Sequence, residues 1–186
     1  MTIVNGLTGF GQPETGIIQT AFVVTDIRRA IDAWLAEGVG PWFHQERWRP
    51  EGATYRGASS TAEISAALCF SGHSQIELLQ PLDDAPSVYR EILDARGPGF
   101  HHIARGTADY DADVACYQAQ GHALAFETLV PTGSRVAYLD TCSILPGFVE
   151  LIETTEANDN FFTAIYDAAR GWDGSAPIRS FESLIF

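Results

Sequence analysis

Four polar side chains that can bind a metal ion lie at matching places in the two halves of the sequence: Gln19, Glu77, His102 and Glu150. Gln19 and His102 each begin an apolar run, and Glu77 and Glu150 each lie inside an aliphatic one. A carboxylate among aliphatic residues is costly unless something neutralises it. An amide, an imidazole and two carboxylates together suit a divalent Zn, Co, Ni, Mn or Mg ion. The matched set therefore predicts one metal site on a pseudo-twofold axis, whereas each residue alone fits an ordinary strand position.

A divalent ion held by these groups can polarise a carbonyl and stabilise the enolate that forms when the adjacent C–H loses a proton. A base must then lie within hydrogen-bond reach of that carbon. Glu150 can serve as this base by releasing the metal. Glu63 is a second candidate, provided that the strand face shared by Glu63, Ser65 and Ala67 points inward; an exposed strand glutamate is the alternative.

The elements that must position these side chains repeat as well. In each half an Asp at an expected helix N-cap follows the first polar residue by seven positions, and a Gly that ends the helix follows the Asp by twelve. These pairs are Asp26 with Gly38 and Asp109 with Gly121. Periodicity in the first half predicts a helix at 26–37, a loop at 49–60, and strands at 17–24, 61–70 and 74–80 around an aromatic segment at 42–48. In the second half it predicts a helix at 109–120 and strands at 100–105, 122–130, 135–141 and 147–153, so that each half reads βαβββ.

This order predicts an α+β fold with a further helix near the C-terminus. The expected divisions are an N-terminal arm at 1–16, a first module at 17–82, a linker turn with a short helix at 83–99, a second module at 100–156, and a C-terminal helix and tail at 157–186.

Composition narrows the classes of function. The net charge is −13 and all eleven basic residues are Arg, which excludes lysine Schiff-base chemistry and disfavours nucleic acid or an anionic membrane as a partner. No apolar run approaches the roughly 20 residues of a membrane span, and no signal-peptide pattern is expected at the N-terminus. The three cysteines form no C-x-x-C pair, which favours a reducing, cytoplasmic location.

Several segments resemble a known family: Gln19-x-Ala21, and the segments 76–82, 99–104 and 149–152. Over about residues 17–153 the chain resembles the vicinal oxygen chelate superfamily, which includes glyoxalase I, methylmalonyl-CoA epimerase and the extradiol dioxygenases. The residues around Glu77 and His102, with those at 38–42, are most similar to the epimerase branch. The resemblance implies that the two βαβββ modules form a cupped, partly open β-barrel with helices outside. It also implies that Gln19, Glu77, His102 and Glu150 hold one divalent ion, although many members have histidine in the place of Gln19.

Strand alternation puts His101 on the face opposite to His102. Aromatic and basic residues near the strands are the expected substrate-binding groups: Trp42, Tyr55, Phe70, Tyr138 and Arg135. Open sheet edges and an apolar helix around residues 161–165 favour a homodimer.

These features predict a metal-dependent isomerase or epimerase that transfers a proton next to a carbonyl, in a CoA thioester or a hydrophobic carbonyl compound. One alternative is a non-catalytic binding protein for a small molecule, as in the resistance proteins. A less favoured alternative is an Fe(II)-dependent ring-cleaving dioxygenase, which normally needs two histidines and one carboxylate. Lyase chemistry stays open.

Overall fold

The two sequence repeats begin in the same way in the computed structural model, which describes residues 6–184. β1 (Ile17–Val23) leads into α1 (Ile27–Ala36), and β7 (Gly99–Thr107) leads into α3 (Tyr110–Ala119). The Asp26 carboxylate accepts a hydrogen bond from the first turn of α1, and the Asp109 carboxylate does the same for α3. Gly38 and Gly121 follow the helices with φ of +79° and +89°, a conformation that favours glycine.

Each repeat continues with three strands. The first adds β2 (Trp42–Trp48), β5 (Ile64–Ser71) and β6 (Ser74–Pro81), and the second adds β8 (Leu124–Leu129), β9 (Arg135–Leu139) and β10 (Phe148–Glu153). The short helix α2 (Val88–Arg96) connects the two repeats. Both modules are therefore βαβββ, in agreement with the α+β fold that the sequence predicts.

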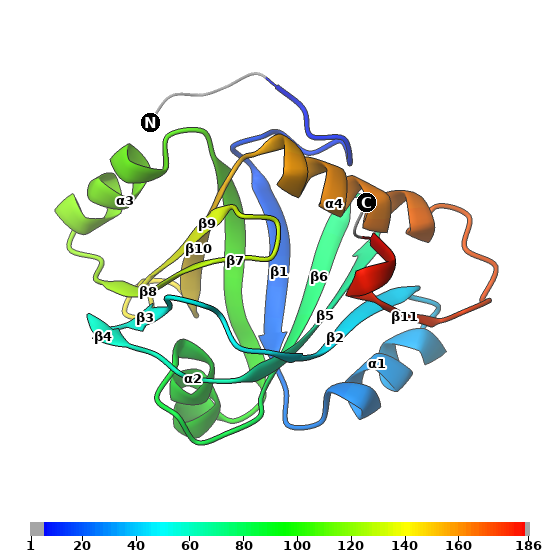
Figure 1. The fold of residues 1–186 in the computed structure, drawn as a ribbon, viewed down its shortest axis with the longest axis horizontal. Helices are drawn as coiled ribbons and strands as arrows, with labels where there is room; N and C mark the ends of the chain where they lie inside the picture. Colours follow the sequence, from blue (N-terminus) through cyan, green and yellow to red (C-terminus); the bar gives the residue numbers. More distant parts are fainter. Residues whose placement is uncertain (1–5, 185–186) are drawn as a thin grey trace.

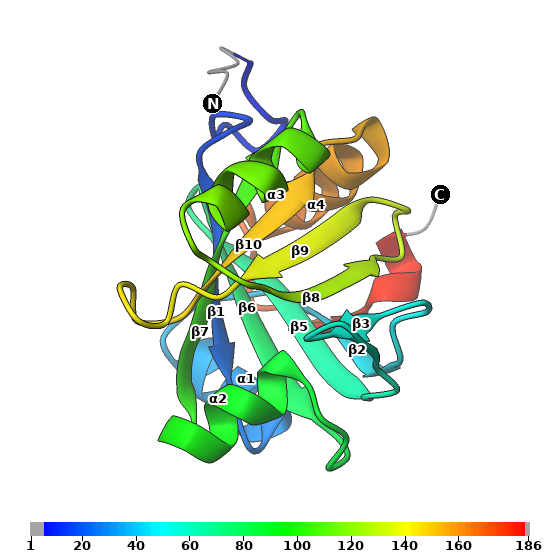
Figure 2. The same ribbon diagram turned by 90° about the vertical axis from the view of Figure 1, so that its left-hand side faces the viewer.

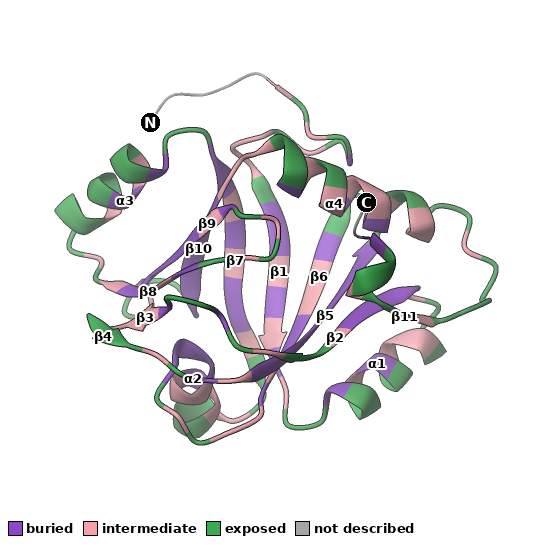
Figure 3. Ribbon diagram, viewed as in Figure 1, coloured by how far each residue is buried: buried purple, intermediate pink, exposed green. Residues whose placement is uncertain are grey.

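All strands of the described chain join in a single eleven-stranded sheet with the order β11-β2-β5-β6-β1-β7-β10-β9-β8-β3-β4. Antiparallel pairing of β1 with β7 connects the modules at its centre, and each of these strands has a parallel neighbour, β6 or β10. The sheet curves into a cup (Figure 1 and Figure 2), and the central strands are mostly buried (Figure 3). The cupped, partly open architecture is confirmed.

Three hydrophobic clusters account for this shape. The largest fills the cup, whereas the second lies under α1 and the third under α3 on the outer face of the sheet. Because side chains alternate along each strand, every central strand contributes to the inside and to one outer layer. No helix within residues 6–184 is long and apolar enough to cross a membrane.

Two segments differ from the sequence-based expectation. The predicted loop at 49–60 contains a hairpin of β3 (Thr54–Tyr55) and β4 (Ala58–Ser59), and β3 pairs with β8 of the other module. The tail contains α4 (Glu156–Ala169), then β11 (Ile178–Ser180), which extends the sheet beside β2, and the 3₁₀ helix η1 (Phe181–Leu184). Helix α4 packs on β5 of the same chain and lies across one end of the cup (Figure 1), so its apolar face is covered without a second subunit.

Candidate metal centre

The pairing of β1 with β7 puts Gln19 and His102 on one face of the sheet. In this antiparallel pair Gln19 lies opposite Ala104, and His102 lies opposite Ala21. Directly paired residues share a face, as do residues two apart along a strand. Gln19 and His102 therefore both point into the cup, and the intervening alanines leave room between them.

The two carboxylates come from the strands on either side. Glu77 of β6 is paired with Ala21, and Glu150 of β10 is paired with Ala104, so the arrangement has approximate twofold symmetry. His102 has no exposed surface, and Glu150 is only 5% exposed. The structure thus brings together the four residues that the sequence predicts to be metal ligands.

The distances among these groups suit ligands of one ion. His102 Nε2 lies 3.1 Å from Glu150 Oε2 and 3.4 Å from Glu77 Oε2. Two donor atoms that each lie about 2.1 Å from one cation are ~3.0–3.4 Å apart when they subtend 90–109° at it. Across residues 6–184 no three His, Cys, Asp or Glu side chains already form a metal-binding cluster. The fit to a metal therefore rests on the chemistry of the donors.

That chemistry is unusual for a protein interior, because three buried acceptor atoms face one another. Glu77 Oε2, Glu150 Oε2 and His102 Nε2 are all buried and make no hydrogen bond. Burial and the nearby Glu150 carboxylate raise the pKa of Glu77 well above its usual range, and a hydrogen bond from Gln19 opposes that shift. A divalent cation would satisfy all three atoms and would remove the repulsion between the carboxylates.

His101 determines which nitrogen of His102 has the lone pair. His101 Nε2 lies 3.1 Å from the carbonyl oxygen of Val88, which can only accept, so Nε2 has the hydrogen. Burial and the adjacent His102 ring lower the pKa of His101 well below its usual range, so the ring is neutral and its Nδ1 accepts. His102 Nδ1 lies 2.8 Å away and must donate to it. In a neutral His102 ring, Nε2 then has the lone pair, as a metal ligand requires.

The prediction that His101 faces away from His102 is therefore wrong. Between the pairs Ala21 with His102 and Phe22 with Phe100, the strand β7 has one extra residue, His101. Such a bulge interrupts the alternation of side chains. The bulge lets both rings reach the interior, where they lie next to each other and both contact the Tyr138 ring.

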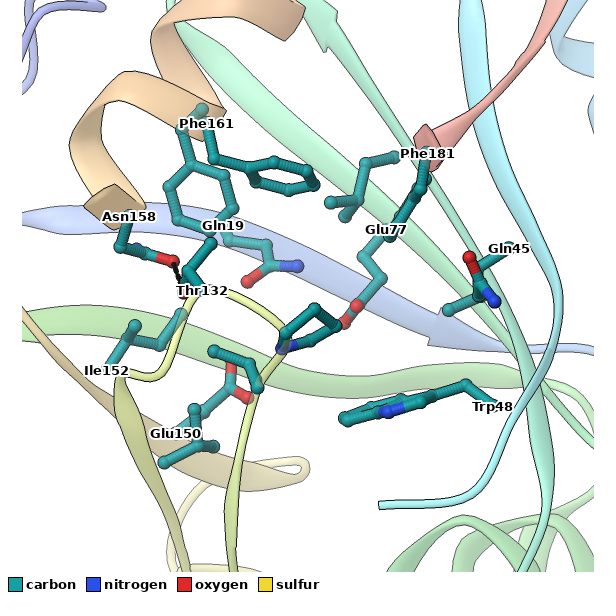
Figure 4. A pocket seen from close by; sticks show the side chains of 16 residues that line it. Gln19, Gln45, Trp48, Glu77, Thr132, Glu150, Ile152, Asn158, Phe161 and Phe181 are labelled. Atoms are coloured by element: carbon teal, nitrogen blue, oxygen red, sulfur yellow. Dashed lines mark hydrogen bonds between the residues drawn. The ribbon is translucent and has the colours of Figure 1, made fainter. Parts of the chain in front are cut away.

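Three of the four residues line a pocket whose volume, counted with the open solvent space at its mouth, is about 610 Å³, whereas buried His102 is not among the lining residues. Gln19, Glu77 and Glu150 line this pocket and point toward its centre (Figure 4). The other lining residues are mostly apolar: Gln45, Trp48, Ala66, Leu68, Val130, Pro131, Thr132, Val136, Ile152, Asn158, Phe161, Phe162 and Phe181. A mainly apolar pocket with a few convergent polar groups is the usual form of a small-molecule site.

The expected substrate-binding residues lie elsewhere. Trp42 is buried under α1, Phe70 packs against Phe10 inside the core, and the Tyr55 hydroxyl donates to Glu91. None of these three lines the pocket among the described residues.

Tyr138 and Arg135 also lie outside the pocket lining. The Tyr138 ring meets the His102 ring edge to face at 4.9 Å, and Tyr138 is the cross-strand neighbour of Glu150, so it supports the site from behind. Arg135 forms ion pairs with Glu153 and Asp111.

Glu63 does not reach the pocket either, because β5 presents its other face to the cup. Ala66 and Leu68 line the pocket, whereas Ala67 lies in the cluster under α1, so the expectation for this face is wrong. The Glu63 carboxylate pairs with Arg47 instead.

Sequence reasoning missed the residues that close the pocket from the C-terminal tail. Phe161 of α4 and Phe181 of η1 form one side of it (Figure 4), and Phe162 of α4 is a further lining residue. The apolar spacing around residues 161–165 predicted a buried helix face, but nothing in that spacing identified its partner.

Comparison with known proteins identifies a matching family and solved structures with a similar fold. The chain matches the family model described as Glyoxalase/Bleomycin resistance protein/Dioxygenase superfamily over residues 18–138. Among curated proteins there is no significant match. The fold is similar to methylmalonyl-CoA epimerase from Mycobacterium tuberculosis, with a TM-score of 0.56 and 22% identity over 83% of this chain and 93% of that chain. It is also similar to a variant of Streptomyces coelicolor methylmalonyl-CoA epimerase in complex with 2-nitronate-propionyl-CoA, with a TM-score of 0.53 and 23% identity over 76% of this chain and 98% of that chain. At these identities the structural likeness concerns the fold alone.

Proposed function

Because this chain belongs to the glyoxalase/bleomycin resistance protein/dioxygenase superfamily, we propose that it is a metal-dependent isomerase or epimerase that transfers a proton next to a carbonyl. The observation that supports this most directly is the convergence of His102, Glu77 and Glu150, whose buried acceptor atoms have no hydrogen-bond partner. Such a site would be costly in a protein that did not bind a cation there.

Gln19, Glu77, His102 and Glu150 would hold the ion through oxygen donors and one imidazole nitrogen. A bound divalent ion supplies a positive charge that stabilises negative charge on a carbonyl oxygen. The mainly apolar walls orient the substrate and exclude water, which strengthens every electrostatic interaction inside.

The proton transfer itself needs a carboxylate in the pocket. Glu150 lines the pocket at 5% exposure, and when its carboxylate is not bound to the ion it would take the proton from the carbon beside the carbonyl. Glu77 occupies the pseudo-symmetric position and is the second carboxylate within the same pocket. A proton returned from the opposite side would give epimerisation, and a proton returned to a different atom would give isomerisation. Glu63 has no part in this proposal, because its side chain is directed away from the cup.

Exchange with solvent tests this proposal. Metal-loaded protein incubated in D₂O with a panel of thioesters and ketones should incorporate deuterium at the α-carbon, and Glu150→Gln should lower the rate by at least about 100-fold, the low end for loss of a general base. Glu63→Gln is the matched control and should leave the rate unchanged. Absence of exchange across the panel, with equal ligand binding by metal-free and metal-loaded protein, would favour the non-catalytic binding protein instead.

The remaining alternative is less compatible with the site. A ring-cleaving dioxygenase normally needs two histidine ligands, and here His101 uses its Nε2 hydrogen on Val88. A cytoplasmic location and a homodimer remain predictions.

A further inference from the structure

We infer that the substrate is an uncharged hydrophobic carbonyl compound that binds within the pocket, and not a CoA thioester. This inference rests on the proposed function, and it concerns the substrate class alone. It follows from the pocket's charge, from the segment that closes the pocket, and from the side chains at its mouth.

The charge inside the pocket is balanced without the substrate. Glu77 and Glu150 are the only charged residues among the described lining residues, and two carboxylates neutralise one divalent ion. An anionic substrate group would therefore enter a mostly apolar space with no cationic partner, and a buried unpaired charge is costly. A neutral carbonyl compound meets no such penalty.

A second hollow shares five lining residues with the pocket, so we take it as the mouth, and it is uncharged as well. The residues around it are Gln45, Pro131, Thr132, Ala157, Asn160, Phe161, Phe181 and Leu184. No Arg or His is among them in the described part of the chain. The phosphates of a CoA thioester that reached the metal centre from this side would find no guanidinium at the mouth to bind them.

The C-terminal tail closes the pocket over the metal centre. Phe161 contacts Phe162 and Phe181 at ring-centroid distances of 5.8 and 5.4 Å, which joins α4 to η1. Thr132 donates to the Asn158 side chain at 3.2 Å, which fastens the start of α4 to the turn between β8 and β9. This aromatic wall comes from α4 and η1, outside the 18–138 segment that matches the family model.

Arginines elsewhere on the cup are mostly engaged. Arg56 forms ion pairs with Glu91 and Asp140, and Arg135 forms ion pairs with Glu153 and Asp111.

Three arginines line one groove on the surface, and this groove is the place where the phosphates of a CoA thioester could bind instead. Arg28, Arg47 and Arg179 line it together with Glu46 and Glu182, so acidic side chains reduce its positive charge. The groove shares Gln45 with the pocket. If CoA phosphates bind anywhere near the mouth, they bind here.

A matched pair of thioesters tests the inference. The same hydrophobic acyl group, 3-phenylpropionyl, is presented once on CoA and once on N-acetylcysteamine, which keeps the thioester and lacks the nucleotide and its phosphates. We expect metal-loaded protein in D₂O to exchange the α-hydrogen of the N-acetylcysteamine thioester with a kcat/KM at least equal to that for the CoA thioester. Free CoA at millimolar concentration should not inhibit.

The aromatic wall is tested with the same substrate. Phe161→Ala should lower kcat/KM for the N-acetylcysteamine thioester about tenfold, the equivalent of ~1.4 kcal/mol of lost apolar contact, without changing the metal content. Asp167→Ala, at an exposed position of the same helix, is the matched control and should have no effect.

The outcomes separate the two proposals. A kcat/KM for the CoA thioester more than tenfold higher, lost in Arg179→Ala, would overturn the substrate class and leave the proton transfer intact. If Arg179→Ala keeps the more than tenfold preference for the CoA thioester, the inferred substrate class is overturned as well. Exchange of neither thioester, together with no exchange across the wider panel of ketones, would overturn the proposed function and this inference with it.

Discussion

Replacing His101 with Phe should weaken metal binding without removing any ligand. Phe keeps the planar shape of the ring but offers no acceptor to His102 Nδ1, which is completely buried. An orphaned buried donor costs about 1–3 kcal/mol. His102 can avoid that cost by moving its hydrogen to Nε2, where the carboxylates of Glu77 and Glu150 would accept it. Nε2 would then no longer be free to bind a cation.

The expected magnitude follows from this competition. A metal ion must return the hydrogen of His102 to Nδ1 before it can bind, so the cost of about 1–3 kcal/mol appears in its affinity. This corresponds to a Kd about 10- to 100-fold higher, the range found when partners of metal-binding histidines are removed. Competition between the protein and a chromophoric chelator for Co²⁺ measures the change directly, and long-range ¹⁵N NMR of the imidazoles reports the tautomer.

Two further variants make the result specific. In His101→Asn the amide oxygen lies near the former Nδ1 position, so this variant should recover most of the affinity that Phe loses. His73→Phe is the matched control. The Nδ1 atom of His73 lies 2.8 Å from the carbonyl oxygen of Phe10, so this ring also forms a hydrogen bond to the backbone, but it lies outside the pocket lining. Unchanged Co²⁺ affinity in His101→Phe, with the same His102 tautomer as the parent, would refute the reasoning.

Four other predictions concern the site, the fold and the assembly. His102→Ala and Glu150→Ala should each lose most of the bound metal in elemental analysis; parental metal content in both variants would contradict the ligand assignment. Because the pKa of Glu77 is raised in the folded metal-free protein, the contribution of Glu77 to the free energy of unfolding should fall as pH rises above 4.5; urea titrations of the parent and of Glu77→Gln at several pH values should show that the difference between them changes in this direction. Burial raises the pKa of the Cys69 thiol to about 12, so in native protein a thiol reagent should label exposed Cys116 and leave Cys69 intact; rapid labelling of Cys69 would argue against the burial of β5. Light scattering should give a mass near twice the 20.2 kDa chain if the predicted homodimer forms, and a monomer mass at micromolar concentration would reject it.

The repeated parts of the fold were predictable because they depend on local chemistry. Asp26 and Asp109 are helix caps, and Gly38 and Gly121 have the positive φ that ends a helix. These repeated signals made the α+β architecture predictable, whereas the superfamily resemblance came from the strand segments 76–82, 99–104 and 149–152. The convergence of the four polar residues follows from the same repeat.

The unpredicted parts depend on contacts between distant segments. Whether Glu63 faces inward depends on the pairing of β5 with β2 and β6, which alternation along a single strand cannot specify. The surface against which α4 packs could not be predicted either, because an apolar stripe shows which face of a helix is buried but not what covers that face. As a result, the sequence identified the polar end of the site and missed most of its apolar wall.

The bulge at His101 has a counterpart in the first repeat. On β1 the extra residue in the pairing with β7 is Ile18, directly before Gln19, just as His101 directly precedes His102. Both bulged residues are buried, and each repeat therefore turns the residue before its polar donor into the interior. An amide oxygen has no tautomer to control, so an aliphatic side chain is sufficient before Gln19. An imidazole needs a partner that fixes its hydrogen, and the equivalent position before His102 contains a histidine bonded to the Val88 carbonyl. The same kind of bulge thus places an aliphatic side chain in the core in the first repeat. In the second repeat it places the histidine that determines which nitrogen of His102 has the hydrogen.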